Sequence, residues 1–298
     1  MTPLLSIVTI TYNHEQYIRQ CIEGVLAQKT SFPIEFIIAD DCSTDETKSI
    51  CEEYAKNNPD IIRLISSSAN VGAVENEQRA LLAAKGKYIA TCEGDDYWTD
   101  PLKLQKQVDF MAAHPDYSVC FHRYLKHRIS DDTWEGDHCD NLFVQDNDEG
   151  VEISLNQFAK QWTTQYLTMV FRKDCYDFRT YKKYRYFRDT HQIYHLIKNG
   201  KCWLFSFIGG VYNITGNGIY TTIDAYKQEL LTAEIDKELW ILNKDILWKE
   251  EYCHVLQDIV YHYKVWRYPA IALMAYSIVL FFLTFDLSQL LRNIRRII

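Results

Sequence analysis

Three carboxylates stand close together in KYIATCEGDDYW, the stretch that covers residues 87–98. Glu93, Asp95 and Asp96 directly follow a short apolar run and come just before two aromatic residues. Like charges crowded at the end of a strand repel one another, so they favour a positive charge nearby. Carboxylate oxygens are the ligands that Mg²⁺ and Mn²⁺ prefer, and we therefore expect one of these ions here.

Polar residues also follow three earlier apolar runs of the sequence. They are Thr11 and Tyr12 after the run 4–10, Asp40 and Asp41 after the run 34–39, and Asn70 after the run 61–66. In an open parallel sheet the ligand lies outside the carboxyl ends of the strands. We therefore expect these residues and the three carboxylates to line one crevice.

The chemistry of the ligand follows from motifs that the sequence lacks. No GxGxxG follows the first apolar run, and no GxxxxGK[ST] occurs anywhere in the chain. Carboxylates do not bind phosphates directly, because both are anions. A metal ion removes this conflict, since it takes carboxylate oxygens on one side and diphosphate oxygens on the other. We predict a nucleotide diphosphate that is held through Mg²⁺ or Mn²⁺.

The elements that position these residues follow from hydrophobic periodicity. Apolar, β-branched runs at 4–10, 34–39, 61–66 and 87–92 alternate with segments of helical spacing at 15–28, 45–57 and 73–85. Such alternation predicts βαβ units and a parallel sheet. Further along the chain we expect helices over 100–115 and 189–200, strands over 164–172 and 202–207, and a helical pattern from about 224 to 265.

Composition excludes several other classes of protein. The net charge of −8 argues against a nucleic-acid binder, which needs a basic face to neutralise phosphates. The nine cysteines form no CxxC pair, which argues against a zinc ribbon or a disulfide framework and favours a reducing cytosol. The first residues lack a basic segment and a cleavage site, so they indicate a first strand rather than a signal peptide.

Five stretches of the chain resemble the family 2 glycosyltransferases of the GT-A fold. They are SIVTITYN, FIIADDCSTDET, NVG, AKGKYIATCEGDDYW and RDTHQIYHLIKNGK, which occur in the family's order and spacing within residues 3–220. The resemblance implies an inverting transfer of a sugar from a nucleotide-diphosphate donor to a hydroxyl acceptor. Bacterial surface-polysaccharide enzymes are the type it suggests, with UDP as the nucleotide.

The resemblance also implies roles for single residues. Thr11, Tyr12 and Asp41 would contact the nucleoside, with Asp40 in support and Asn70 nearby. Asp95 would lie near the ribose and share the metal with Asp96, its main ligand, while Glu93 occupies the first position of the same motif. Asp189 matches the catalytic base. The chain departs from the family's usual residues at Glu93, Arg188, Asn213 and Thr215.

The C-terminal residues 266–298 differ from the rest of the chain. Residues 268–285 carry no charge and would form a helix of about 27 Å, just under the ~30 Å thickness of a bilayer core. An amphipathic stretch with Arg292, Arg295 and Arg296 follows, which is typical of an interfacial helix. We expect a peripheral or monotopic protein on the cytoplasmic face of the cell membrane, with a saccharide or lipid-linked saccharide as acceptor. The alternative is a helix buried in a homodimer.

Together these features predict an α/β chain of the GT-A type: a Rossmann-like, mostly parallel sheet flanked by helices, with a C-terminal helical membrane-associated extension. Residues 1–222 would form the GT-A domain, with a nucleotide-sugar half at about 1–115 and an acceptor half at about 116–222. A helical segment at 223–265 and the membrane-associating helices at 266–298 would follow. A nucleotidyltransferase and a non-catalytic membrane-bound scaffold are the two alternatives. Asp189 has an alternative of its own, as the cap of the helix that follows it.

Overall fold

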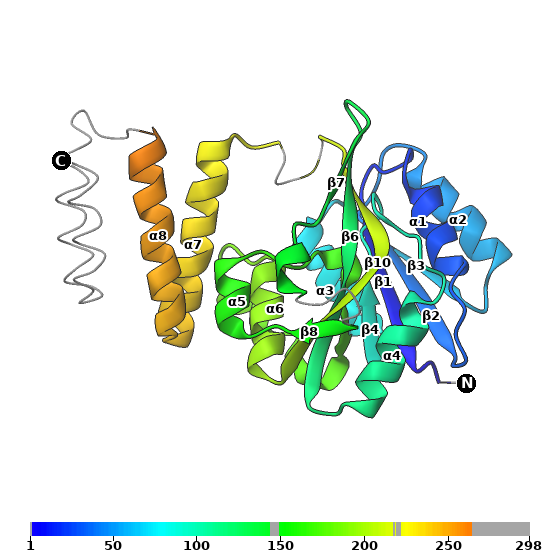
Figure 1. The fold of residues 1–298 in the computed structure, drawn as a ribbon. Helices are drawn as coiled ribbons and strands as arrows, with labels where there is room; N and C mark the ends of the chain where they lie inside the picture. Colours follow the sequence, from blue (N-terminus) through cyan, green and yellow to red (C-terminus); the bar gives the residue numbers. More distant parts are fainter. Residues whose placement is uncertain (1, 144–148, 217, 219–221, 264–298) are drawn as a thin grey trace, which may run out of the picture. The chain divides into compact units, whose positions relative to one another are not determined.

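The computed structural model describes residues 2–143, 149–216, 218 and 222–263 (Figure 1). Its strands are β1 (Leu5–Thr11), β2 (Ile34–Asp40), β3 (Ile62–Ser66), β4 (Tyr88–Thr91), β5 (Tyr97–Trp98), β6 (Tyr117–Arg128), β7 (Thr133–Gly136), β8 (Gly150–Glu152), β9 (Val170–Arg172) and β10 (Lys201–Ile214). Its α-helices are α1 (Ile18–Leu26), α2 (Thr47–Asn57), α3 (Ala73–Ala83), α4 (Lys103–Ala113), α5 (Leu155–Lys160), α6 (Asp189–Lys198), α7 (Ala225–Asn243) and α8 (Ile246–Tyr263).

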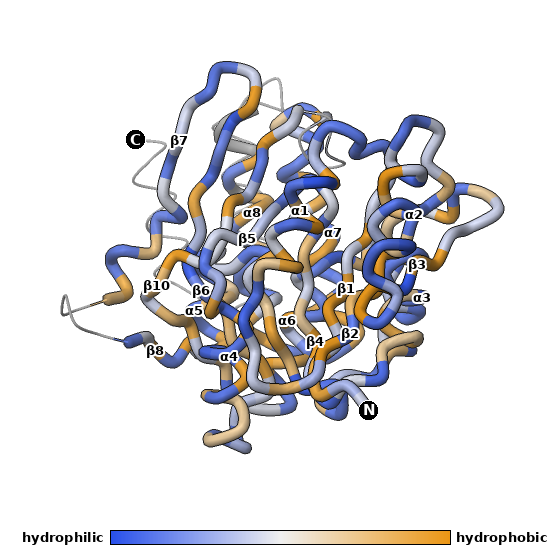
Figure 2. Tube along the Cα trace, turned by 90° about the vertical axis from the view of Figure 1, so that its right-hand side faces the viewer, coloured by the Kyte–Doolittle hydropathy of each residue, from blue (hydrophilic) through white to orange (hydrophobic). Residues whose placement is uncertain are grey.

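The first four strands confirm the predicted βαβ pattern. They lie in the order β3-β2-β1-β4, and each adjacent pair is parallel. The side chains of β1 and β2 are almost all buried, as expected for strands that are covered on both faces. Figure 2 shows these central strands as hydrophobic segments of the trace. The carboxyl ends of β1, β2 and β4 therefore meet along one edge, where the predicted site residues follow.

Helix α1 shows how the sequence produces this packing. Its buried residues Ile18, Cys21, Ile22 and Val25 recur at three- and four-residue steps, so they lie on one side of the helix. They belong to one hydrophobic core with residues of β1, β2 and β4. The helix thereby covers the sheet directly after the first polar cluster.

The second half of the sheet is mixed rather than parallel. Beyond β4 the order continues β9-β6-β10-β5, with β7 beside β6 and β8 beside β10. Strand β9 is antiparallel to both of its neighbours, and β5 is antiparallel to β10, whereas β6 and β10 are parallel. The predicted mostly parallel sheet flanked by helices is thus confirmed, with antiparallel strands inserted in its second half.

One predicted strand is wrong over most of its length. Residues 164–172 form a 3₁₀ turn at Tyr166–Thr168 and only then the short strand β9. The hydroxyl of Thr168 donates to the carbonyl of Gln165 and accepts from its backbone N–H. Local bonds of this kind compete with sheet pairing, which explains why an apolar run here does not extend into a strand.

The chain divides into two compact units. Residues up to 181 form the first unit together with 192–216, and residues 182–191 form the second with those after 216. Within the described part of the second unit, α7 and α8 pack against each other and confirm the predicted helical pattern. No helix among the described residues has both the length and the apolar character needed to cross a bilayer. The predicted membrane-associating segment 266–298 lies outside the described residues.

Candidate active site

The acidic loop after β4 turns back beside β10. The N–H of Asp96 donates to the carbonyl of Glu93 over 3.1 Å, which closes the turn. The backbone N–H of Asn213 donates to Oδ1 of Asp96 over 2.9 Å, and its side-chain amide donates to the carbonyl of Asp95 over 2.6 Å. A residue of β10 therefore holds the loop, although it is 117 positions away along the chain.

Asp96 is the buried member of this loop, whereas Glu93 and Asp95 are partly exposed. Its second carboxylate oxygen, Oδ2, is buried and has no hydrogen-bond partner. Burial raises the pKa of Asp96 well above its ordinary value, and the negative charges of Asp95 and Glu93 raise it further. A buried carboxylate of this kind is stabilised in its charged form by a bound cation.

The residues present fit a magnesium-type ion. Among the described residues no group of three or more His, Cys, Asp and Glu side chains is arranged to hold a metal. Mg²⁺, however, is commonly bound by only one or two carboxylates, together with phosphates of the substrate and water. The orphaned oxygen of Asp96, with Asp95 as its neighbour, supplies ligands of that kind.

The end of β1 packs directly against the acidic loop. A Cβ at Gly94 would lie only 2.6 Å from Oγ1 of Thr11 and 2.9 Å from Nδ1 of His14, so glycine is needed for this close approach. Both of those atoms are buried and have no hydrogen-bond partner. His14 also places Nε2 3.9 Å from Oδ2 of Asp95. Buried polar atoms without partners are rare in folded proteins, and here they border the predicted crevice.

The ends of β1 and β2 are joined by their own polar side chains. Asn13 has a φ of +55°, and its side-chain oxygen accepts from the backbone N–H of Thr44. The carboxylate of Asp40 is buried and accepts from the N–H of Ser43. Tyr12, in contrast, is 42% exposed and presents its ring to solvent. Asp40 is thus buried at the end of β2, whereas the ring of Tyr12 is accessible to solvent.

Asp41 holds the loop that follows β3. Its two carboxylate oxygens accept from the backbone N–H groups of Val71 and Gly72 over 2.9 and 2.8 Å. The side chain of Asn70 accepts from the same Gly72 N–H over 3.1 Å. Gly72 has a φ of +87°, which a residue with a side chain rarely adopts. The polar clusters after β2 and β3 therefore lie together, as the sequence predicts.

Asp189 belongs to the second unit. It is the first residue of α6, and its Oδ1 accepts from the backbone N–H of Thr190 over 2.9 Å. Burial raises the pKa of Asp189, while the Thr190 N–H and the charge of Arg188 lower it. The side chain lies at the start of a helix, and its role as the base stays a prediction.

Two residues of this site have no role assigned from the sequence. His14 is one position beyond the polar cluster that ends β1, and its type and place in TYNHE are a usable signal. Asn213 stands out in the sequence only as a departure from the usual residue of the resembled family, since its contact with the acidic loop depends on the pairing of β10 with β5 and β6.

Comparison with protein families gives a match to glycosyl transferase family 2 over residues 6–141. An uncharacterized protein of Mycobacterium tuberculosis is 54% identical over 118 residues, which make up 40% of this chain and 34% of that protein. TuaG of Bacillus subtilis, named as a teichuronic acid biosynthesis glycosyltransferase, is 41% identical over 110 residues, 37% of this chain and 42% of TuaG. The matched part thus covers less than half the length of these relatives.

Two solved structures share the fold. Residues 1–349 of TarS from S. aureus, in complex with UDP-GlcNAc, align with a TM-score of 0.60 at 16% identity, over 98% of this chain and 90% of that one. The mannosyltransferase PcManGT from Pyrobaculum calidifontis, in complex with GDP-Man and Mn²⁺, gives a TM-score of 0.56 at 14% identity, over 99% and 87%. At identities this low the likeness shows the fold alone.

Proposed function

We propose, from the premise that residues 6–141 are a glycosyltransferase family 2 domain, that this chain transfers a sugar from a nucleotide-diphosphate donor to a hydroxyl acceptor. The observation that carries the proposal is the buried, unpartnered Oδ2 of Asp96 at the carboxyl ends of the strands. A negative oxygen in that place is suited to a metal-bound diphosphate and has no evident structural use. The proposal includes inversion at the anomeric carbon, and UDP as the nucleotide.

The predicted site residues divide the chemistry between them. Asp189 would accept the proton of the acceptor hydroxyl as its oxygen attacks the anomeric carbon. Asp96, with Asp95 beside it, would hold Mg²⁺ or Mn²⁺, and the ion supplies positive charge to the departing diphosphate. Asp41 orders the loop of Asn70 at the place where the nucleoside would bind. No covalent intermediate with the enzyme is required.

The first test is binding of the donor. We expect UDP-sugars to raise the melting temperature only when Mn²⁺ or Mg²⁺ is present, since the ion links the carboxylates to the diphosphate. At a ligand concentration of 100 times Kd the added stability is about 2.7 kcal/mol. The measurement is a thermal shift screen of nucleotide sugars with and without EDTA, followed by an assay for released nucleoside diphosphate.

The outcomes separate the alternatives. Release of UDP together with a new glycoside supports the proposal. Release of pyrophosphate from a nucleoside triphosphate and a sugar phosphate would instead identify a nucleotidyltransferase. Metal-dependent binding without any turnover or donor hydrolysis would favour the non-catalytic scaffold.

We further propose that the acceptor is a lipid-linked saccharide of cell-surface polysaccharide synthesis, used at the cytoplasmic face of the membrane. The support is the charge-free sequence 268–285 and the arginine-bearing stretch after it. TuaG, the Bacillus subtilis relative, is named for teichuronic acid biosynthesis. An enzyme held at the membrane would meet a lipid-borne acceptor in two dimensions.

Deletion of residues 266–298 tests this placement. We expect the full chain to sediment with membranes and the shortened chain to remain in the supernatant, because the apolar segment is removed. The shortened chain should keep its metal-dependent stabilisation by the donor, since the site is built from residues before 220. A full chain that stays in the supernatant as a monomer without detergent contradicts the membrane proposal, and one that does so as a dimer favours the buried-helix alternative.

A further inference from the structure

The hairpin formed by β6 and β7 carries an exposed aromatic residue. Trp134 stacks on His127, with ring centroids 4.0 Å apart and an angle of 10° between the ring planes. His127 also contacts Asp132, whose Oδ1 lies 2.7 Å from Nε2 of the histidine. Although His127 covers one of its faces, Trp134 remains 49% exposed. Its other face is therefore open to solvent.

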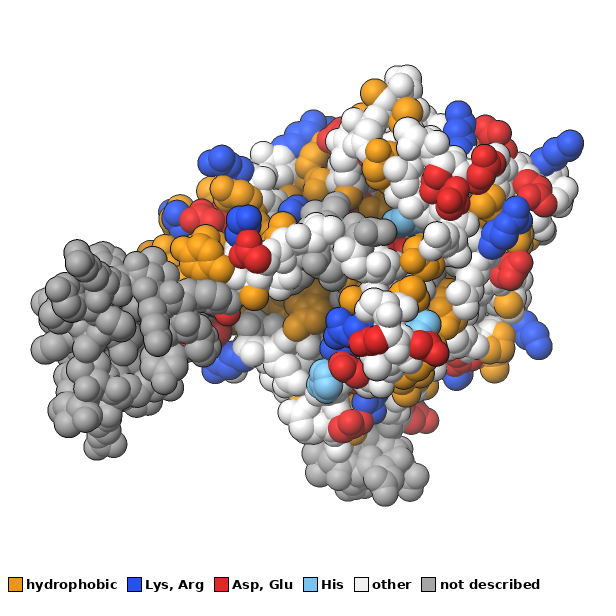
Figure 3. All heavy atoms as spheres, turned by 90° about the horizontal axis from the view of Figure 1, so that it is seen from above, with side chains coloured by type: hydrophobic (Ala, Val, Ile, Leu, Met, Phe, Trp, Pro, Cys, Tyr) orange, Lys and Arg blue, Asp and Glu red, His pale blue; other side chains and the backbone are white. Residues whose placement is uncertain are grey.

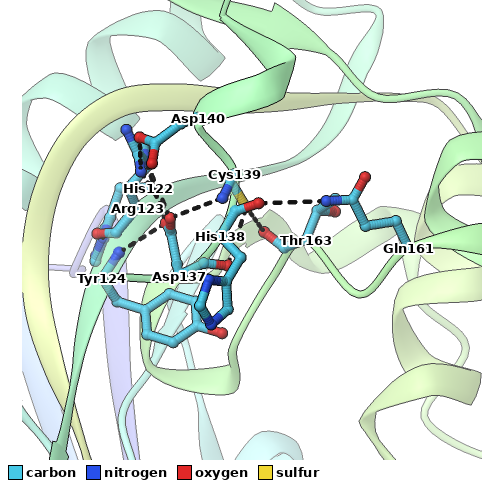
Figure 4. Close-up of polar contacts among 9 residues, drawn as sticks. All are labelled: His122, Arg123, Tyr124, Asp137, His138, Cys139, Asp140, Gln161 and Thr163. Atoms are coloured by element: carbon cyan, nitrogen blue, oxygen red, sulfur yellow. Dashed lines mark hydrogen bonds and ion pairs between the residues drawn. The ribbon is translucent and has the colours of Figure 1, made fainter. Parts of the chain in front are cut away.

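The hairpin is anchored at its base by a buried carboxylate. Asp137, the residue after β7, accepts from the guanidinium of Arg123 and from the backbone N–H groups of Tyr124 and Cys139 (Figure 4). The side chain of Asp137 is almost fully buried, so this ion pair is shielded from water. The sulfur of Cys139 donates in turn to the carbonyl of Thr163. The strand that carries Trp134 is thus fastened immediately beyond its end.

The register of the sheet connects Trp134 with the acidic loop. Trp134 lies opposite His127, and His127 lies opposite Asn213. Asn213 in turn donates to the carbonyl of Asp95, which lies beside β10 on the continuation of β5. Residues opposite one another on neighbouring strands point to the same face of a sheet. Asn213, His127 and Trp134 therefore form one row that leads away from the predicted diphosphate position.

The length of this row suits a saccharide. Three strand spacings separate Asp95 from Trp134, which amounts to about 14 Å. The transferred sugar would lie next to the diphosphate, and an acceptor ring would come next along the row. The face drawn in Figure 3 mixes acidic and basic side chains with exposed hydrophobic ones, and shows no single large basic area. Close to Trp134 in the sequence the exposed residues include Asp131, Asp132 and Glu135, so a neutral sugar suits this hairpin better than a polyanion does.

We propose that the outward face of Trp134 is a stacking platform for a sugar ring of the acceptor. This proposal rests on the proposed function, since it assigns a place to the second substrate of the same site. A pyranose presents a patch of C–H groups that packs flat on an indole, while its hydroxyls remain available to polar groups. The tryptophan loses little freedom on binding, because His127 already fixes its ring.

The experiment compares three variants with the wild type. Trp134→Ala removes the platform, Trp134→Phe keeps an aromatic face, and Trp162→Ala removes another exposed tryptophan of the same unit as a matched control. The probes are the methyl β-glycosides of glucose, galactose and N-acetylglucosamine, together with lactose, in saturation-transfer NMR at millimolar concentration. We expect transfer to the ring C–H protons of at least one sugar in the wild type, and binding about tenfold weaker in Trp134→Ala.

Donor binding separates the two proposals. Trp134→Ala should keep the metal-dependent stabilisation by the donor, which a general loss of structure would not allow, and Trp134→Phe should retain most of the sugar signal. Equal sugar signals in the wild type and Trp134→Ala overturn the platform, as does a wild type that binds none of the four sugars. If no nucleotide sugar stabilises the wild type while Trp134-dependent sugar binding remains, the proposed function fails and the platform stands.

Discussion

Replacing Asp96 with asparagine is expected to abolish sugar transfer and the metal-dependent stabilisation by the donor, without unfolding the protein. Asparagine keeps an oxygen for the N–H of Asn213, so the loop retains the 2.9 Å bond that positions it. It removes the negative charge that holds the cation. Loss of charge stabilisation at the leaving group should lower the rate by about 10³-fold or more. The measurements are the transfer rate and the donor thermal shift with Mn²⁺.

The thermal stability of Asp96→Asn without metal, unlike its activity, should not fall. Asp96 is buried with Oδ2 unpartnered, so its charge costs free energy in the metal-free protein. The melting temperature of Asp96→Asn without metal should therefore equal or exceed that of the wild type. Asp109→Asn, which changes an exposed carboxylate on α4, is the matched control and should retain full activity. Full activity of Asp96→Asn in EDTA would refute the metal-binding role.

Replacing Asp189 with asparagine should lower the transfer rate by about 10²–10⁴-fold, the usual worth of a positioned general base. The amide has nearly the same shape and can still accept from the N–H of Thr190, but it cannot take up a proton. Donor stabilisation with Mn²⁺ should remain, because Asp189 has no part in holding the diphosphate. Asp174→Asn, on the exposed surface nearby in the sequence, provides the control. A wild-type rate in Asp189→Asn would show that Asp189 is not the base and only begins helix α6.

The dependence of the rate on pH provides a second readout for Asp189. A base must be unprotonated to act, so the rate should fall as the pH drops through the pKa of Asp189. Because burial raises that pKa, the fall should begin at a higher pH than an exposed aspartate would give. In Asp189→Asn the residual rate should lack this acid limb.

The first half of the fold could be predicted because its information is local. Each run of β-branched residues and each helical repeat lies within about a dozen positions, and the parallel pairs β1–β2, β2–β3 and β1–β4 follow from them. The second half depends on pairing between distant strands. Strand β10 extends over 201–214, well beyond the predicted 202–207, and its register with β6 shifts near Phe205 and Ile208. Such irregularities have no signature in a single strand's sequence.

The residues of the candidate site also differ in whether the sequence could place them. Asp41 and Asn70 could be placed together from the order of the strands, and the structure brings both to Gly72. Asn213 could not be placed, since its role depends on which strand lies beside β5. Asp189 belongs to a different compact unit from the other carboxylates, and its part in the site stays a prediction.

The bond between Asn213 and Asp96 also has a consequence for how the chain folds. It closes a loop of 117 residues, so forming it requires a large loss of chain entropy that local contacts do not repay. Contacts of such high sequence separation slow folding. During synthesis the family-matched segment 6–141 is complete long before residue 213 has been added. The acidic loop therefore acquires its final geometry only after β10 has joined the sheet, and a nascent chain that already contains every carboxylate of the predicted donor site still lacks the strand that orders them.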